Sequence, residues 1–235
     1  MAKKLMSPLT QSLPTKSLAD YLTRQLETFF PDGEVVSAGE VLHFTEVALG
    51  RIAECFRPIG FGYYRDGDAP RFSHLNTDHY ATFLYLFSNA AFLENGTSSL
   101  PIKAYGLNKA LHGLDVHPAV ALPTVFLFVH PVGTVIGRAT FGNFFAVYQN
   151  CTVGGDLDSN CPVFGDRVAM FAGSRVIGKS RVGSDCLIAA DTTVIDGTVP
   201  DGTTTFGRPP DVRSKPTKHD VLKKVFMCSD PGVRP

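Results

Sequence analysis

The fold is decided by the stretch FGDRVAMFAGSRVIGKSRVGSDCLIAADTTVIDGTVPDGTTTF, residues 164–206, which repeats with a period of six residues. Every sixth position holds a large apolar residue or proline: Phe164, Met170, Val176, Val182, Ile188, Val194, Pro200 and Phe206. The position four residues further on is small or β-branched: Val168, Ser174, Ser180, Cys186, Thr192, Thr198 and Thr204. This period is typical of a parallel β-helix, in which each hexad is one short strand and a turn, and three hexads complete a coil. We expect both rows to face inward.

The same six-residue step continues upstream with two interruptions. It runs through Leu114, Val120, Phe126 and Val132, slips by three residues to Val135, and continues through Phe141, Val147 and Val153. Turn-forming residues at positions 154–161 fill the second break, where we expect a loop to leave the prism. A β-sandwich is the alternative, but its apolar alternation would have a period of two.

The first half carries helical periodicity instead. Apolar residues recur at three- and four-residue steps over residues 17–30, 40–56, 77–95 and 99–113, with Ser17 and Thr77 as candidate caps. The polar segment 65–76 reads as a loop. The sequence therefore predicts an α+β chain: an α-helical domain over residues 1–113, a β-helix over 114–212 and a C-terminal tail over 213–235.

Composition narrows the class of protein. The chain has 22 Lys+Arg and 22 Asp+Glu, a net charge of zero that argues against nucleic acid as a partner. It has neither an apolar run of the roughly 18 residues that a membrane span needs nor a secretory leader, so we expect a cytoplasmic protein. The 5 cysteines lack paired spacing, which indicates neither disulfides nor a zinc ribbon.

A carboxylate and an imidazole fall near one corner of the predicted prism. Asp115 and His130 are separated by slightly less than one coil, so they lie on adjacent layers. A carboxylate can orient one ring nitrogen while the other accepts a proton from a hydroxyl. The alternative is that both are ordinary solvated corner residues.

Three segments resemble a known family: DVHP at 115–118, HPVGTVIGRA at 130–139 and QNCTVGG at 149–155. They are similar to the catalytic half of the serine O-acetyltransferases, which are left-handed β-helix, hexapeptide-repeat acyltransferases. The resemblance covers about residues 107–212 and includes the closing GRPP at 207–210. It implies a left-handed β-helix and acetyl-CoA as co-substrate, with no metal.

The resemblance also implies roles for individual residues. Asp115 and His130 match the family's catalytic pair, and we assign His117 to the acceptor side. Small residues match the coils that face the pantetheine arm of coenzyme A: Gly154, Gly155, Ala172 and Ala190. Arg208, or Lys215 beyond it, would meet the nucleotide phosphates. The prism itself also needs small residues at its corners, and cations there are often only solvated.

The departures from the family concern the acceptor. Val129 stands where the family has an aspartate that holds the serine ammonium, and Asn160 and Cys161 stand where it has an arginine and a histidine that hold the carboxylate. Each charged hydrogen bond contributes roughly 1.5–3 kcal/mol, so we expect weak or absent acetylation of serine. We read Cys161 as a loop residue rather than a nucleophile.

The polar loop between the predicted helices offers replacements for the missing charges. Its candidates are Asp78, His79, Arg65 and Arg71.

The leading hypothesis is an acetyl-CoA-dependent O-acetyltransferase in which Asp115 orients His130, the general base. One alternative is a sugar O- or N-acyltransferase of surface polysaccharide biosynthesis, and another is a non-catalytic hexapeptide scaffold. A zinc hydratase is disfavoured because it needs three histidines, and the coils contain only His117 and His130. We expect a homotrimer, or a dimer of trimers, with a site between neighbouring prisms.

Overall fold

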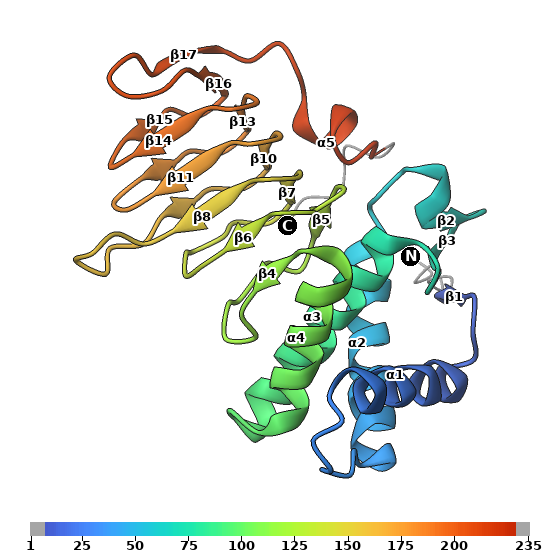
Figure 1. Ribbon diagram of the computed structural model, residues 1–235. Coiled ribbons are helices and arrows are strands. Elements are labelled where there is room, and N and C mark those ends of the chain that lie inside the picture. Colours follow the sequence, from blue (N-terminus) through green and yellow to red (C-terminus); the bar gives the residue numbers. More distant parts are fainter. Residues whose placement is uncertain (1–7, 229–235) are drawn as a thin grey trace.

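The computed structural model describes residues 8–228 and confirms the predicted fold class. A helical region leads directly into a parallel β-helix, and the two lie side by side (Figure 1). One continuous apolar core contains side chains from both parts. The predicted division into domains at residues 113 and 212 stays a prediction.

Four long helices form the first part: α1 (Thr15–Phe29), α2 (Ala38–Phe56), α3 (Thr77–Asn95) and α4 (Ser99–His112). Two predicted caps are wrong. Helix α1 begins before Ser17, because Pro14 sets the extended entry and no side chain caps the helix. Helix α3 is capped by Asn76 rather than Thr77, and the Asn76 side chain accepts hydrogen bonds from the N–H groups of Asp78 and His79.

The segment predicted as a loop contains two short strands. Strands β2 (Arg65–Asp66) and β3 (Ala69–Phe72) follow the 3₁₀-helix η1 (Gly62–Tyr64), and β1 (Thr10–Gln11) pairs with β3 from the N-terminal side. The loop prediction was wrong there because the pairing partner of β3 comes from a distant part of the sequence, and burial of Phe72 anchors the strand.

The β-helix has three faces. The first face contains β5 (Phe126–Phe128), β7 (Phe145–Val147), β10 (Val168–Met170), β13 (Cys186–Ile188), β16 (Thr203–Phe206) and the antiparallel edge strand β17 (Arg213–Pro216). The second contains β4 (Asp115–Val116), β6 (Val135–Ile136), β8 (Thr152–Gly154), β11 (Arg175–Ile177) and β14 (Thr193–Ile195). The third contains β9 (Val163–Phe164), β12 (Arg181–Val182) and β15 (Thr198–Val199). Along the chain, the first corner joins the first face to the second face, and the second corner joins the second face to the third. The third corner leads from the third face back to the first.

The six-residue ladder fills the prism as predicted over most of its length. Met170, Val176 and Ile188 are fully buried, and so are members of the small row such as Ser174 and Thr192. The prediction is wrong at the end of the ladder, where Pro200 is exposed and Phe206 is 37% exposed. The step from the inward-facing Val194 to the inward-facing Val199 is five residues rather than six, so the predicted positions after Val194 no longer face inward.

The predicted slip near residue 132 marks an enlarged turn at the first corner. The step from the inward-facing Phe128 to the inward-facing Ile136 is eight residues, whereas the step from Val147 to Val153 one coil further on is six. The turn after β5 therefore holds two extra residues. As a result, Val132 and Val135, both predicted to face inward, lie outside, and Val132 is 62% exposed.

The last described segment, residues 217–228, runs back from β17 toward the helical region (Figure 1). We call it the C-terminal strap; it contains helix α5 (Val221–Lys224). Phe226 packs edge-on against Phe144 beside β7, and its carbonyl accepts the N–H of Gly60 at 2.8 Å. The strap therefore ties the β-helix to the segment that precedes η1.

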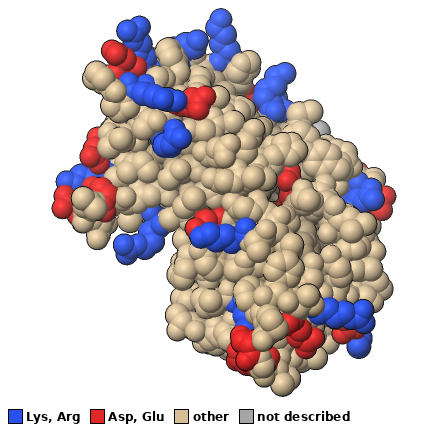
Figure 2. Space-filling model, viewed as in Figure 1, with Lys and Arg blue, Asp and Glu red and all other residues tan. Residues whose placement is uncertain are grey.

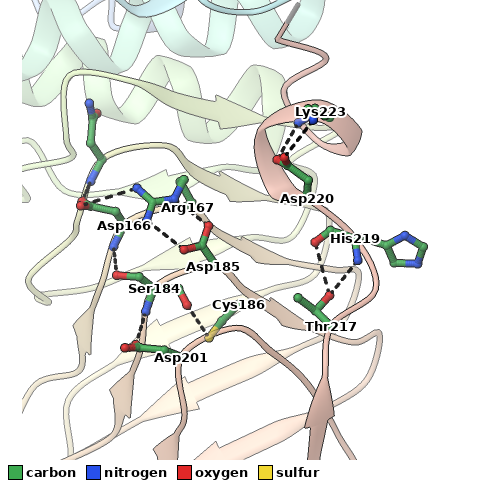
Figure 3. A network of polar contacts seen from close by, with 11 residues as sticks. Asp166, Arg167, Ser184, Asp185, Cys186, Asp201, Thr217, His219, Asp220 and Lys223 are labelled. Atoms are coloured by element: carbon green, nitrogen blue, oxygen red, sulfur yellow. Dashed lines mark hydrogen bonds and ion pairs between the residues drawn. The ribbon is translucent and has the colours of Figure 1, made fainter. Parts of the chain in front are cut away.

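A polar network reinforces the third corner next to this strap (Figure 3). Arg167 donates two hydrogen bonds to Asp185 of the next coil, at 2.6 and 2.8 Å. Ser184 donates its N–H to Asp201 at 2.7 Å. These contacts join successive coils where the backbone of Arg167 and Asp185 adopts positive φ angles, 58° for both.

The visible face carries scattered charges of both signs and no broad patch of either (Figure 2). Within residues 8–228, no helix is long and apolar enough to cross a membrane.

Candidate active site

His130 stands out from the enlarged turn at the first corner. Its backbone is in the left-handed region, with φ 47°, and its side chain is 78% exposed. Val129 beside it donates its N–H to the Val147 carbonyl at 3.0 Å and packs against the core. The two extra residues of this turn thus present an accessible imidazole while the neighbouring backbone stays in the coil.

The carboxylate that approaches His130 comes from the helical region. Asp78, at the start of α3, has Oδ2 3.3 Å from the His130 backbone N and 3.8 Å from its ring Nδ1. Asp78 is buried, and its Oδ1 atom has no hydrogen-bond partner among residues 8–228. Burial raises the pKa of Asp78, and the hydrogen bond and charge of His130 oppose that shift. A buried carboxyl group whose Oδ1 has no partner in the described part of the chain therefore lies beside an exposed imidazole.

Asp115 has other partners within the chain. At the start of β4 it accepts hydrogen bonds from Tyr105 Oη at 2.5 Å and Lys109 Nζ at 2.6 Å, both on α4. Burial acts to raise the pKa of Asp115, but the hydrogen bonds from Lys109 and Tyr105 outweigh it and lower that pKa. Among the described residues, no hydrogen bond or ion pair joins Asp115 to His130. Their catalytic pairing stays a prediction.

His117 lies near Asp115 rather than near His130. Its ring packs edge-on against Tyr105 and Phe92, with centroids 5.6 and 5.7 Å apart, and its Nδ1 accepts the N–H of Ala119. Its assignment to the acceptor side is untested.

A groove of about 660 Å³ runs along the first corner, on the outer side of the first face. Its floor is made of small and apolar residues, among them the predicted Ala172 and Ala190, which succeed one another on adjacent coils. A second hollow of about 580 Å³ shares these two alanines and extends to Gly133, in the same turn as His130. The two hollows together connect the His130 turn with the later coils.

Two features of this groove fit coenzyme A. The Gln149 Oε1 atom, which is buried at the edge of both hollows, has no hydrogen-bond partner in the described part of the chain and could accept an amide N–H. Lys215, Lys218 and His219 line the same groove and could meet phosphate groups. In Figure 3 the His219 ring points away from the network of the third corner. A pantetheine arm offers amides and an apolar chain, and the nucleotide end offers phosphates.

Arg208, the predicted phosphate contact, is at the same corner. Its Nε donates to the Asp191 carbonyl at 3.1 Å, and its guanidinium lies 3.8 Å from the Asp191 carboxylate. The guanidinium remains largely exposed beside Ala190.

The other predicted residues lie at the second corner, in the loop extruded after β8. Gly154 ends that strand, and Gly155 begins the loop, where a Cβ would approach the Asn160 carbonyl oxygen to 2.9 Å. The Asp156 carboxylate organises the loop by accepting the N–H and side-chain amide of Asn160 at 2.9 and 2.8 Å. Cys161 is half-buried there. Within one chain, the predicted residues therefore divide between two corners.

The sequence analysis named Asp78 only as one of four candidates. It gave no role to four residues that line the groove, namely Tyr148, Gln149, Lys218 and His219. Gln149 could have been found, because it follows the inward-facing Val147 by two residues and so occupies the corner row of Ala172 and Ala190. Arg65, another of the four, instead donates to the backbone carbonyls of Arg57, at the end of α2, and of Gly67 and Asp68.

The structure is thus a parallel β-helix of hexapeptide repeats with an exposed histidine near a groove. No family model matches the chain. Serine acetyltransferase from Staphylococcus epidermidis is 32% identical over 107 residues, which cover 44% of this chain and 50% of that protein. The chain thus spans about half the length of the curated relatives it matches.

Solved structures extend the likeness to the helical region. Serine acetyltransferase from Brucella abortus in complex with coenzyme A superposes with a TM-score of 0.67 at 20% identity, covering 88% of this chain and 84% of that one. The enzyme from Neisseria gonorrhoeae in complex with serine gives 0.62 at 24% identity, covering 86% and 83%. These comparisons confirm the resemblance to the serine acetyltransferases and the shared fold.

Proposed function

We propose that this chain is an acetyl-CoA-dependent O-acetyltransferase in which His130 is the general base. The observation that carries the proposal is the exposed His130 ring, which lies beside the buried Asp78 carboxylate and in the same turn as Gly133, a residue that lines the second hollow at the first corner. The similarity to serine acetyltransferases, one of them solved with coenzyme A, supports the same chemistry. The scaffold alternative leaves this exposed imidazole and the groove without a role.

The groove residues would hold the co-substrate. Ala172 and Ala190 leave room for the pantetheine arm, Gln149 Oε1 would accept one of its amides, and Lys215 and Lys218 would meet the phosphates. When bound, acetyl-CoA supplies a thioester whose C–S bond breaks as the acceptor oxygen bonds the acetyl carbon, with the acceptor proton passing through His130 to the leaving sulfur.

The His130 ring takes the acceptor proton on the nitrogen that does not face a carboxylate. Asp78 approaches Nδ1, which leaves Nε2 to act as the base and favours the imidazolium that forms. The resemblance gives this orienting role to Asp115, whereas the contacts between Asp78 and His130 within one chain favour Asp78. Substitution of each carboxylate in turn is needed to decide which of the two orients His130.

We further propose a homotrimer, or a dimer of trimers, working in the cytoplasm. Val135 and Ile195 expose apolar side chains on the second face, and Leu157 stands fully exposed on the loop after β8. Packing of neighbouring prisms would cover these side chains. It would also bring a second-corner loop, with Asn160 and Cys161, to the first corner of another copy.

Thiol release from acetyl-CoA tests the proposal, with a panel of amino acids and sugars as acceptors. We expect His130→Ala to lower turnover by about 10²–10⁴-fold, while His43→Ala, at an exposed histidine on α2, leaves it unchanged. Asp78→Asn and Asp115→Asn should each cost less than His130→Ala, and the larger loss identifies the orienting carboxylate. Wild-type turnover by His130→Ala would refute the general-base role.

A further inference from the structure

Part of the groove is formed by the chain that returns from the β-helix. Besides residues of the first face, the groove of about 660 Å³ is lined by Lys215 and Pro216 of β17 and by Lys218 and His219 of the C-terminal strap. The two lysines proposed to meet the phosphates of acetyl-CoA thus both stand on this returning chain. Its position decides whether they face the groove.

The strap begins against the last coil (Figure 3). The Thr217 N–H donates to the Gly202 carbonyl at 2.8 Å, and the Thr217 hydroxyl accepts the N–H of His219 at 3.3 Å. Helix α5 then starts at Val221. Residues 218–220 therefore form a short bridge between the last coil and α5.

The far end of the strap is anchored on the helical region. The Phe226 side chain is fully buried, and the Phe226 carbonyl accepts the N–H of Gly60 at 2.8 Å. The Cys228 thiol donates a hydrogen bond to the Pro58 carbonyl, also at 2.8 Å. Residues 58–60 lie between α2 and η1, so a segment distant in the sequence holds this end of the strap.

Glycine at position 60 allows the strap to approach this closely. A Cβ on Gly60 would clash with the carbonyl group of Met227, whose carbon atom would lie 2.7 Å away. Because the obstacle is backbone, the strap would have to move. Two residues further on, a Cβ on Gly62 would have nothing within 4 Å. Alanine should therefore displace the strap at position 60 and leave it in place at position 62.

The two anchor residues can affect the groove only through the strap, because neither Gly60 nor Phe226 is among the residues that line it. A bridge that moves freely must become ordered when a ligand binds, and the lost conformational entropy weakens binding. A bridge held at both ends is already ordered before the ligand arrives. Docking of the strap should therefore favour binding in the groove.

We propose that Gly60 and Phe226 are positioning residues for the co-substrate, because docking of the strap on residues 58–60 holds Lys218 and His219 beside the phosphates of acetyl-CoA. The inference rests on the proposed function, since the groove must take acetyl-CoA. The phosphates take no part in the transfer of the acetyl group, so their contacts are the same in the bound substrate and in the transition state. Loss of the docking should raise the KM for acetyl-CoA and leave kcat and the acceptor KM unchanged.

Calorimetric titration with coenzyme A compares the wild type with Gly60→Ala and with Gly62→Ala, the matched control. We expect Gly60→Ala to bind coenzyme A about 3- to 10-fold more weakly, which is the scale of one or two exposed charge contacts, and Gly62→Ala to bind it like the wild type. Phe226→Ala should weaken binding in the same way, whereas Phe226→Leu keeps an apolar side chain and should retain most of the affinity. In turnover assays, the KM for acetyl-CoA should rise by the same factor at constant kcat.

Trypsin reports whether the strap has left its place, because Lys223 and Lys224 on α5 are exposed. Cleavage after these lysines should be faster in Gly60→Ala than in the wild type and in Gly62→Ala. The rest of the chain should stay intact, and thermal unfolding should remain cooperative. This pattern separates release of the strap from unfolding of the whole protein.

The possible outcomes distinguish the inference from the proposed function. Unchanged cleavage of α5 in both Gly60→Ala and Phe226→Ala, or a released strap with wild-type affinity for coenzyme A, would overturn the inference and leave the acetyltransferase proposal standing. A loss of kcat at an unchanged KM for acetyl-CoA would also overturn it, because the two residues would then only support the fold. Absence of coenzyme A binding by the wild type would instead overturn the proposed function, and the inference with it.

Discussion

The buried histidines make the fold sensitive to acid, and His112 allows the effect to be measured at one site. His112, at the end of α4, is buried against Tyr80, and its Nδ1 lies 2.8 Å from Asn108 Oδ1. Burial lowers the pKa of His112 from 6.5 to about 4. The unfolded chain therefore binds a proton at a higher pH than the folded chain, and stability falls as the pH drops from 6.5 toward 4.

The size of the effect follows from the two pKa values. One pKa unit corresponds to about 1.4 kcal/mol, so the contribution of His112 to the free energy of unfolding should fall by about 2 kcal/mol between pH 7 and pH 5. His79, whose burial lowers its pKa to about 4, should lose a similar amount. Other titrating groups also change the free energy of unfolding between pH 7 and pH 5. Their contribution is common to two variants and cancels when the variants are compared.

Urea unfolding at pH 7 and pH 5 gives this difference for the wild type and for His112→Gln. Whatever His112→Gln costs at pH 7, its loss of stability on acidification should be about 2 kcal/mol smaller than that of the wild type. His43→Gln, at an exposed histidine of α2, should follow the wild type. Equal acid sensitivity of His112→Gln and the wild type would refute the claim that a buried neutral imidazole is involved.

Two further predictions concern the coils and the groove. Gly142→Ala should destabilise the protein by about 1–3 kcal/mol, measured by thermal unfolding, because the added Cβ would lie 2.4 Å from the backbone of Gly165. Gly154→Ala is the control. Its Cβ would meet Ile177 at an ordinary 3.6 Å, so this variant should unfold at nearly the same temperature as the wild type. Lys218→Gln should raise the KM for acetyl-CoA about 2- to 5-fold without changing kcat, as expected for an exposed cation near a phosphate. An unchanged KM would remove Lys218 from the co-substrate site.

The hexad ladder was predictable because each coil repeats the same requirement for one large and one small inward side chain. The end of the ladder after Val194 was not predictable. A step of five residues instead of six leaves the kinds of residue in the segment unchanged, and it only turns Pro200 and Phe206 outward. Position 132 shows the opposite case. There the sequence revealed the interruption, and the structure adds that it enlarges the turn of His130.

The site was less predictable than the fold, because its parts come from distant segments. Asp78 lies 52 residues before His130, and only the packing of α3 against the first face brings them together. Asp115, 15 residues before His130, looked like the natural partner by spacing, yet its carboxylate is held by Tyr105 and Lys109 within the chain. Contacts of this kind depend on helix packing, which leaves no periodic signal in the sequence.

Mass spectrometry of the acceptor tests the central claim most directly. The purified protein is incubated with acetyl-CoA labelled with ¹³C in the acetyl group and with the acceptor panel, in parallel with His130→Ala. The account predicts one labelled acetyl group on a hydroxyl of an acceptor, formed by the wild type and reduced by about 10²–10⁴-fold in His130→Ala. Labelled product formed equally well by both proteins, or by neither although acetyl-CoA binds, would contradict it.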